Sequence, residues 1–326
     1  MCDLPDDEEG SGPMIDAKQL AKRYGEKTAV DGLDFVVKPG TVTGFLGPNG
    51  AGKSTTMRMI VGLDAPTSGT VTVNGRRYEQ HRAPLQEVGT LLEARSIHPG
   101  RSAYQHLRAL ALTHGIPRRR VDEVIGITGL GSVAGKRAGA FSLGMGQRLG
   151  IAAALLGDPR TVMLDEPVNG LDPEGVLWIR NLLTSLAAEG RTVFVSSHLM
   201  SEVALVADHL IVIGRGRMLA DTTVRELVRE AGGNTVRVAA QDPARLREVL
   251  AGPGVEITGQ AGAEELQVTG LSARDIGLRA AEHGIALFEL HTRQVSLEEA
   301  FMELTRDSVE YQGTPAEALA STGRPA

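Results

Sequence analysis

Short apolar runs rich in β-branched residues alternate with helical patterns along most of this chain. The runs predict strands at residues 42–46, 71–73, 88–92, 162–164, 192–196 and 210–213. Polar or glycine-rich residues and then a helical pattern follow the strands that end at Leu46, Leu164 and Ser196. This alternation is typical of an α/β domain with a mostly parallel core sheet, whose ligands collect at the carboxyl ends of the strands.

The pattern changes after about residue 221. Strand-like runs at 235–240, 255–259, 265–269 and 286–291 are interleaved with helical patterns at 243–250 and 273–283. The order β-α-β-β-α-β predicts a small α+β domain of the ferredoxin-like type. A last helix begins at Ser296, whose hydroxyl can cap it while Glu299 completes a capping box.

Length and composition agree with two folded domains between two tails. The chain has 326 residues, of which 42% are hydrophobic and 23% charged, so it can bury a sizeable core. Residues 1–13 are acidic, and residues 308–326 are rich in Gly, Pro, Ser, Thr and Ala. Both stretches have little to bury, and we predict that they are disordered.

Charge and cysteine content exclude several classes of function. The net charge is −6 and the isoelectric point is near 5.8, which argues against a protein that binds nucleic acid through phosphate attraction. Cys2 is the only cysteine, which excludes an intramolecular disulfide and a thiolate zinc site. No apolar run approaches the ~18 residues that a membrane-spanning helix needs, so a role in transport requires a separate membrane partner.

A phosphate-binding loop follows the first predicted strand. The pattern G-x-x-x-x-G-K-[ST] is formed by Gly47, Pro48, Asn49, Gly50, Ala51, Gly52, Lys53 and Ser54. A strand precedes the loop and a helical pattern at 55–61 follows it. Glycines allow backbone N–H groups to surround a phosphate, and the helix N-terminus adds partial positive charge. We expect Lys53 to reach the β- and γ-phosphates and the Ser54 hydroxyl to ligate Mg²⁺.

Two carboxylates end a second buried strand. Asp165 and Glu166 follow the apolar run 162–164 at the carboxyl end of that strand, the end at which the phosphate loop is also expected. We expect Asp165 to hold Mg²⁺ through water. Glu166 would orient or deprotonate the water that attacks the γ-phosphate.

The residues up to about 225 resemble the ATP-binding cassettes of ABC transporters. Residues 141–145 (FSLGM) are similar to the family signature, residues 169–172 (NGLD) to the loop after the carboxylate pair, and His198 to the switch histidine. Tyr24 stands where the family stacks an aromatic ring on adenine. The resemblance implies a P-loop NTPase cassette at 14–225, with a mostly parallel core sheet, an antiparallel β subdomain and a helical subdomain that carries the signature.

The family resemblance also implies a mechanism. Two cassettes face head to tail, and each ATP lies between the phosphate loop of one subunit and the signature of the other. Ser142 and Gly144 would approach the partner's γ-phosphate, although Ser142 can also be a helix cap and nothing more. His198 would hold the γ-phosphate and the attacking water. The resemblance adds Thr55 and Asp172 to the residues that contact the nucleotide.

One residue departs from the family pattern. Glu93 occupies the position at which the family usually has a glutamine that contacts magnesium and couples to the membrane subunit. A carboxylate can also ligate Mg²⁺, and the same replacement is similar to the branch of bacitracin and daunorubicin exporters. Residues 93–100 are then a candidate surface for the membrane subunit's coupling helix. The accessory domain at 226–307 also resembles this branch, and it either packs over the cassette or regulates its opening.

The hypothesis is therefore an ATP-hydrolysing subunit of an ABC exporter that uses ATP and Mg²⁺. It would work as a homodimer at the cytoplasmic face of the cell membrane, with a membrane-spanning permease and without nucleic acid, and would drive efflux of a small amphipathic, antibiotic-like compound. An importer, or a lipid or polysaccharide exporter, is an alternative. A soluble nucleotide switch is disfavoured because the chain has one phosphate loop and no heptads. A non-catalytic module is disfavoured because Glu166 and His198 are present.

Overall fold

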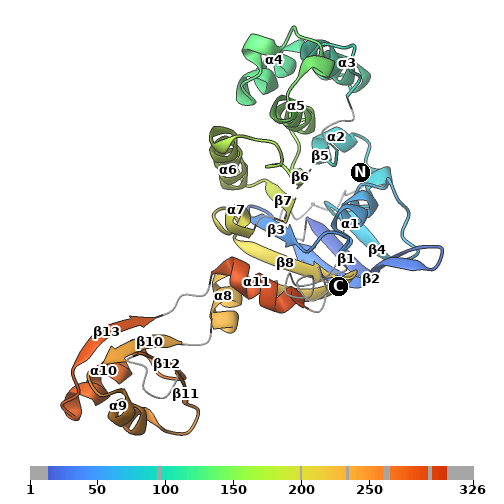
Figure 1. Cartoon of the computed structure of the whole chain (residues 1–326). Coiled ribbons are helices and arrows are strands. Elements are labelled where there is room, and N and C mark those ends of the chain that lie inside the picture. The colour runs from blue at the N-terminus through green and yellow to red at the C-terminus, as the bar shows by residue number, and fades with distance from the viewer. Residues whose placement is uncertain are drawn as a thin grey trace, which may run out of the picture. The chain divides into compact units, whose positions relative to one another are not determined.

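The computed structural model describes residues 14–93, 97–198, 200–232, 235–259, 265–292 and 296–306. The packing divides these residues into two units (Figure 1). One contains the described residues up to Thr222 together with Thr305 and Arg306, and the second is Thr223–Leu304. The tails that we predict at 1–13 and 308–326 lie outside the described residues. Among the described residues, no helix is long and apolar enough to cross a membrane.

The core of the first unit is a six-stranded sheet of order β5-β6-β7-β3-β8-β9. The strands are β3 (Val42–Leu46), β5 (Val88–Leu91), β6 (Thr161–Asp165), β7 (Thr192–Ser197), β8 (His209–Gly214) and β9 (Arg217–Thr222). The first five in the sheet order are parallel, and β9 pairs antiparallel with β8. Every residue of β3 and β7 is buried, which explains why both strands are mostly apolar and do not alternate between apolar and polar residues. The predicted parallel core is confirmed.

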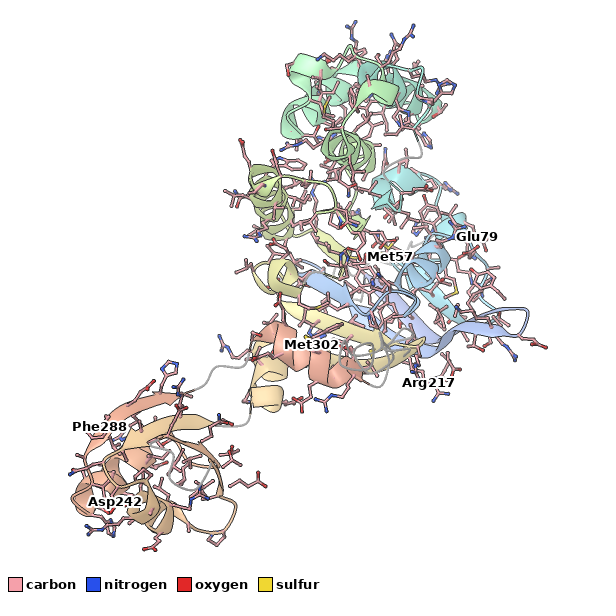
Figure 2. The ribbon with its side chains drawn as sticks, in the orientation of Figure 1. Met57, Glu79, Arg217, Asp242, Phe288 and Met302 are labelled. Atoms are coloured by element: carbon pink, nitrogen blue, oxygen red, sulfur yellow. The ribbon has the colours of Figure 1, made fainter. Side chains whose placement is uncertain are left out.

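A second sheet of the same unit has the order β2-β1-β4 and is antiparallel. Its strands are β1 (Ile15–Tyr24), β2 (Lys27–Val37) and β4 (Ser68–Val73). Phe35 of β2 packs against Phe45 and Phe194 of the core sheet, with ring centroids 5.1–6.0 Å apart within this trio. Helix α1 (Lys53–Ile60) buries Met57 in the same cluster (Figure 2). The two sheets therefore share one hydrophobic core.

Helices α3 (Ala103–Thr113), α4 (Arg118–Ile127) and α5 (Leu143–Leu155) form the helical subdomain. They bury Leu107, Val121 and Leu149 in a cluster that continues into α6 (Pro173–Ala188) and the core sheet. Two short helices, α2 (Pro84–Glu87) and α7 (Met200–Ala204), and short 3₁₀ turns complete the described part of the unit.

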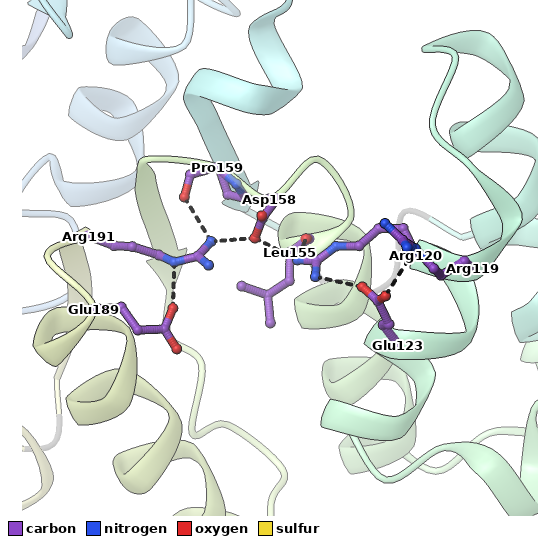
Figure 3. Close-up of polar contacts among 8 residues, drawn as sticks. All are labelled: Arg119, Arg120, Glu123, Leu155, Asp158, Pro159, Glu189 and Arg191. Atoms are coloured by element: carbon purple, nitrogen blue, oxygen red, sulfur yellow. Dashed lines mark hydrogen bonds and ion pairs between the residues drawn. The ribbon is translucent and has the colours of Figure 1, made fainter.

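A polar network connects α4 to the turn after α6 (Figure 3). Asp158 follows α5 and accepts contacts from Arg120 at 3.0 Å and from Arg191 at 2.8 Å. Arg191 also pairs with Glu189 at 2.9 Å and donates to the carbonyl of Pro159 at 3.1 Å. These contacts tie the helical subdomain to the core beside the amino ends of β6 and β7.

The second unit contains the predicted ferredoxin-like arrangement. Its elements are α8 (Val224–Gly232), β10 (Val236–Ala240), α9 (Pro243–Leu250), β11 (Glu256–Thr258), β12 (Glu265–Thr269), α10 (Ala273–Glu282), β13 (Leu287–Thr292) and α11 (Leu297–Thr305). The four strands form an antiparallel sheet of order β11-β12-β10-β13. Helices α9 and α10 bury Leu246 and Ile276 against Val236, Val238 and Val268 on one face of that sheet. The predicted α+β fold is confirmed.

Candidate functional site: the edge where β3, β6 and β7 end

The phosphate loop connects β3 to α1, and its glycines are required by close contacts. A Cβ on Gly47 would lie 2.5 Å from the carbonyl oxygen of Ile213, and a Cβ on Gly52 would lie 2.5 Å from that of Ala29. Gly52 also has φ 104° and Gly50 has φ 83°, which side chains disfavour. The loop can therefore lie against the neighbouring backbone only with glycine at these positions.

Lys53, at the start of α1, has a buried ammonium group. The side chain is 7% exposed, and its Nζ donates to the carbonyl of Gly47 at 2.7 Å. Glu166 Oε1 lies 3.9 Å from Nζ. Burial lowers the pKa of Lys53, and the charges of Glu166 and Asp165 oppose this shift. The loop thus contains a desolvated cation that an anionic phosphate would stabilise.

Ser54 and Asp165 meet at the end of β6. The Ser54 hydroxyl donates to Asp165 Oδ2 at 2.6 Å, and the Ser196 hydroxyl donates to Oδ1. Ser196 is brought there by the parallel register of β6 and β7, in which it lies opposite Asp165. A hydroxyl and a carboxylate are the oxygen ligands that Mg²⁺ takes at phosphate sites, where substrate phosphates and water complete the shell. The residues present therefore fit this cation.

Glu166 is held in an unusual backbone conformation. Its φ is 50°, in the left-handed region. Its backbone N–H donates to two oxygens of Ser196, the hydroxyl Oγ at 3.0 Å and the carbonyl oxygen at 3.2 Å. Gln147 of α5 donates to its carbonyl at 3.1 Å. Strained backbone of this kind persists where surrounding contacts hold it, and it is frequent at active sites.

The Glu166 carboxylate contacts the predicted switch histidine. Oε2 lies 2.7 Å from Nδ1 of His198, and the backbone N–H of His198 donates to the same oxygen at 3.4 Å. His198 directly follows β7, so the two side chains come from the ends of neighbouring strands. Both predicted catalytic residues thus lie together, with Lys53 on the other side of the carboxylate.

One pocket contains the phosphate loop and Tyr24. It is lined by Tyr24, Lys27, Ala29, Glu166 and the run of residues 49–55, which includes Thr55. The Tyr24 side chain is 48% exposed, and its hydroxyl donates to Asp64 at 2.9 Å. Burial and this hydrogen bond raise the pKa of Tyr24. Arg58 holds the same carboxylate at 2.7 Å, so the ring is fixed beside the pocket. The Lys22 ammonium lies over one face of the ring, 5.0 Å from its centroid, so a base would stack on the other face.

The signature region lies on other elements. Ser142 is the N-cap of α5, and its hydroxyl accepts from the N–H of Met145 at 3.2 Å. A Cβ on Gly144 would lie 2.8 Å from the carbonyl oxygen of Gly170, so Gly144 permits close packing within this chain. Asp172 caps α6 by accepting from the N–H of Gly175 at 2.8 Å. Within this chain, Ser142 and Asp172 therefore act as helix caps.

Glu93 lies two residues beyond β5 and is exposed. Its charge contributes to the raised pKa of Arg58, after the larger effect of the hydrogen bond from Arg58 to Asp64. Part of the candidate coupling surface, residues 94–96, lies outside the described residues. Ile97 and Pro99 line a hollow with Ser142, Leu143 and Gly146, so this segment lies beside the signature.

Three residues of the site were not predicted from the sequence. They are Ser196, which positions Asp165 and Glu166, Gln147, which holds the Glu166 backbone, and Asp64, which holds Tyr24. A signal for Ser196 existed, because a serine at the carboxyl end of a buried strand has polar neighbours there. Gln147 and Asp64 contact residues that are distant in sequence and carry no comparable signal.

The chain is similar to proteins of one known family. A family model described as ABC transporter matches residues 30–169. The bacitracin transport ATP-binding protein BcrA of Enterococcus faecalis is 33% identical over 89% of this chain and 96% of its own length. The chain belongs to the ABC transporter family. BcrA of Bacillus licheniformis is 43% identical over 64% of this chain and 69% of its own length.

Solved structures agree with the fold. One described as the ATP-binding subunit of an ABC transporter has a TM-score of 0.62 and 27% identity, over 67% of this chain and 93% of its own length. The cassette fold and the ATPase activity inferred from the motifs are thus confirmed. ATP-binding subunits of this family work with membrane permeases and dimerise. A second model, for a domain of unknown function (DUF8746), matches residues 234–298 in the ferredoxin-like part.

Proposed function

We propose that this ATPase drives export of a small amphipathic, antibiotic-like compound through a separate membrane-spanning permease. The observation that supports ATP hydrolysis is the convergence of Lys53, Glu166 and His198 at one sheet edge. The observation that supports export is the similarity to the bacitracin transport proteins, which extends over the accessory domain in the Enterococcus faecalis relative. The subunit would act at the cytoplasmic face of the membrane.

Hydrolysis would follow from the geometry of the site. Tyr24 stacks on adenine, the loop amides surround the phosphates, and Lys53 binds the β- and γ-phosphates. Ser54, Asp165 and Glu93 would hold Mg²⁺, which offsets phosphate charge when bound. Glu166 accepts a proton from the attacking water, whose oxygen bonds to the γ-phosphorus as the bond to the ADP oxygen breaks. His198 orients Glu166 and contacts the γ-phosphate.

Two identical chains would complete the sites. The N-terminus of α5, with Ser142 as its cap and Gly144 in its first turn, would approach the γ-phosphate bound by the other chain. Asp172 would lie near the same junction, at the start of α6. ATP then holds two cassettes together, and hydrolysis releases them.

The test is transport in vesicles that contain the chain together with a co-expressed candidate permease. ATP-dependent accumulation of bacitracin or a similar amphipathic peptide in inverted vesicles is expected, and it should disappear in the Glu166→Gln variant. Accumulation that is unchanged by Glu166→Gln would contradict the proposal. Transport of a lipid or polysaccharide instead would favour that alternative.

A further inference from the structure

Strand β13 forms one edge of the ferredoxin-like sheet. Among the strands that the structure describes, it pairs only with β10, and the sheet order leaves its other side at the margin. One edge of a strand carries a row of backbone N–H and C=O groups that another strand can pair with. The opposite margin of the sheet is β11, which has only three residues.

The side chains of β13 do not protect this edge. All five residues from Phe288 to Thr292 are exposed, with Phe288 at 69% and Leu290 at 37%, and Phe288 projects from the strand in Figure 2. The strand contains neither lysine nor proline, the residues that usually prevent edge pairing. A long exposed edge with apolar side chains fits the addition of another strand.

We propose that β13 pairs antiparallel with β13 of a second copy of this chain, so that two accessory domains share one eight-stranded sheet. A second copy is the natural occupant because an edge that pairs with itself can close a two-fold dimer. The proposal rests on the two-copy arrangement given under the proposed function.

Geometry limits the register. The N–H and C=O groups of every second residue point to the same edge of a strand. Two residues that face each other across the new pair must therefore both have even numbers or both have odd numbers. A two-fold axis therefore passes between a residue and its own copy. An axis at Glu289 would place two carboxylates opposite each other, and an axis at Phe288 would pair only residues 287–289 of the strand.

A two-fold axis at Leu290 avoids opposed carboxylates and pairs more of the strand than an axis at Phe288 does. It places Glu289 opposite the partner's His291, so residues 289–291 pair regularly, and it brings Phe288, where the register with β10 shifts, opposite the partner's Thr292. Glu289 and His291 lie opposite Ala239 and Arg237 of β10. Those two residues alternate with the buried Val236 and Val238, so the Glu289–His291 pair lies on the sheet face away from the helices.

The register can be tested by cysteine cross-linking of the full chain. Cys2, the only cysteine, is first replaced by serine. Leu290→Cys then places two thiols opposite each other across the two-fold axis, within disulfide reach, whereas Thr258→Cys, at an exposed position of β11, is the control at the other margin. With mild oxidation and no nucleotide, we expect the Leu290→Cys dimer to form about ten-fold faster than the control dimer. Equal rates would overturn the proposal.

A charge exchange tests the pairing without cysteine. In sedimentation at several concentrations, Glu289→Lys is expected to weaken accessory-domain pairing by about ten-fold, because two attractive contacts are lost. Adding His291→Glu to the same chain should restore it, since the introduced lysine of one copy then faces the introduced glutamate of the other. Failure of that restoration would overturn the register even if cross-linking succeeds. Cross-linking needs no hydrolysis, so a chain that fails to export a compound can still pair through β13. A chain that exports a compound can likewise fail to pair through β13, so the two proposals can fail separately.

Discussion

The Nδ1 atom of His198 lies 2.7 Å from Oε2 of Glu166, and this contact joins the ends of two parallel strands. A carboxylate held by an imidazole has a fixed direction and keeps one oxygen toward the phosphate loop, where Glu166 Oε1 lies 3.9 Å from Lys53 Nζ. Glu166, the predicted general base, therefore lies between Lys53, which is predicted to bind phosphate, and His198, which orients the Glu166 carboxylate.

Replacing His198 by alanine should lower hydrolysis more than nucleotide binding. The variant loses the contact that orients Glu166, and we expect kcat to fall by about 10²–10³-fold while the Kd for ATP changes little. Phosphate release and calorimetry measure the two quantities. His209→Ala is the control, because His209 also contacts a carboxylate, that of Asp221 at 2.5 Å, on strands outside the site. A His198→Ala variant with normal kcat would remove the histidine from the catalytic machinery.

Glu166→Gln should trap two chains around ATP. The amide has the same shape but cannot accept the proton of the attacking water, so ATP stays bound and the closed dimer accumulates. Size-exclusion chromatography with light scattering in saturating ATP is the measurement. The same experiment in ADP at the same protein concentration is the control, in which a smaller dimer fraction is expected because only the contact through β13 remains. A variant that remains monomeric in ATP contradicts the head-to-tail arrangement.

Much of this site could be predicted because the signal is local. The strand β3 is fully buried and mostly apolar, and the loop after it carries its glycines and Lys53 at fixed spacing. Strand β1 was not predicted, because Gln19 has φ 47° and the pairing register shifts between Ala17 and Leu20, which breaks the period-two pattern of burial. The antiparallel subdomain was expected from the family resemblance alone.

The contacts of Ser196 show a different limit. Its hydroxyl reaches Asp165 only because β6 and β7 are neighbours in register, a relation between residues that are 31 positions apart. Gln147 reaches the Glu166 carbonyl because α5 packs beside the same edge. Contacts of this kind depend on sheet order and helix packing, so they cannot be predicted from the spacing of residues within a single stretch of sequence.

Lys53→Ala should abolish ATP binding, and the pH dependence of the native protein should identify the same group. Burial lowers the pKa of Lys53, so as pH rises the ammonium loses its proton before an exposed lysine does. ATP requires the charged form, and its affinity should therefore fall as pH rises within a range below the ordinary lysine pKa. Calorimetry across alkaline pH measures this. In Lys53→Arg, whose guanidinium stays charged, any remaining affinity should not show this alkaline decline.

Glu93→Ala should separate hydrolysis from transport. The substitution removes one proposed Mg²⁺ ligand and one proposed contact with the membrane subunit. We expect it to lower the number of molecules transported per ATP hydrolysed more than it weakens ATP binding. Paired transport and phosphate assays in vesicles measure that ratio, with the exposed Glu79→Ala as a control. A loss of ATP affinity with an unchanged ratio would show that Glu93 serves the nucleotide and its cation alone.

Asp158→Asn should loosen the connection between the helical subdomain and the core. Asp158 receives Arg120 and Arg191 at 3.0 Å and 2.8 Å, and its φ of 55° suits asparagine as well as aspartate. The substitution therefore removes charge without adding backbone strain. Since the carboxylate is 59% exposed, solvent screens the pairs, and we expect a loss of only about 0.5–1 kcal/mol of unfolding free energy. Denaturant unfolding measures it. The difference between the two proteins should shrink in high salt, because screening weakens the ion pairs of the native chain and leaves the neutral variant unaffected. A difference that persists at high salt would assign the effect to packing.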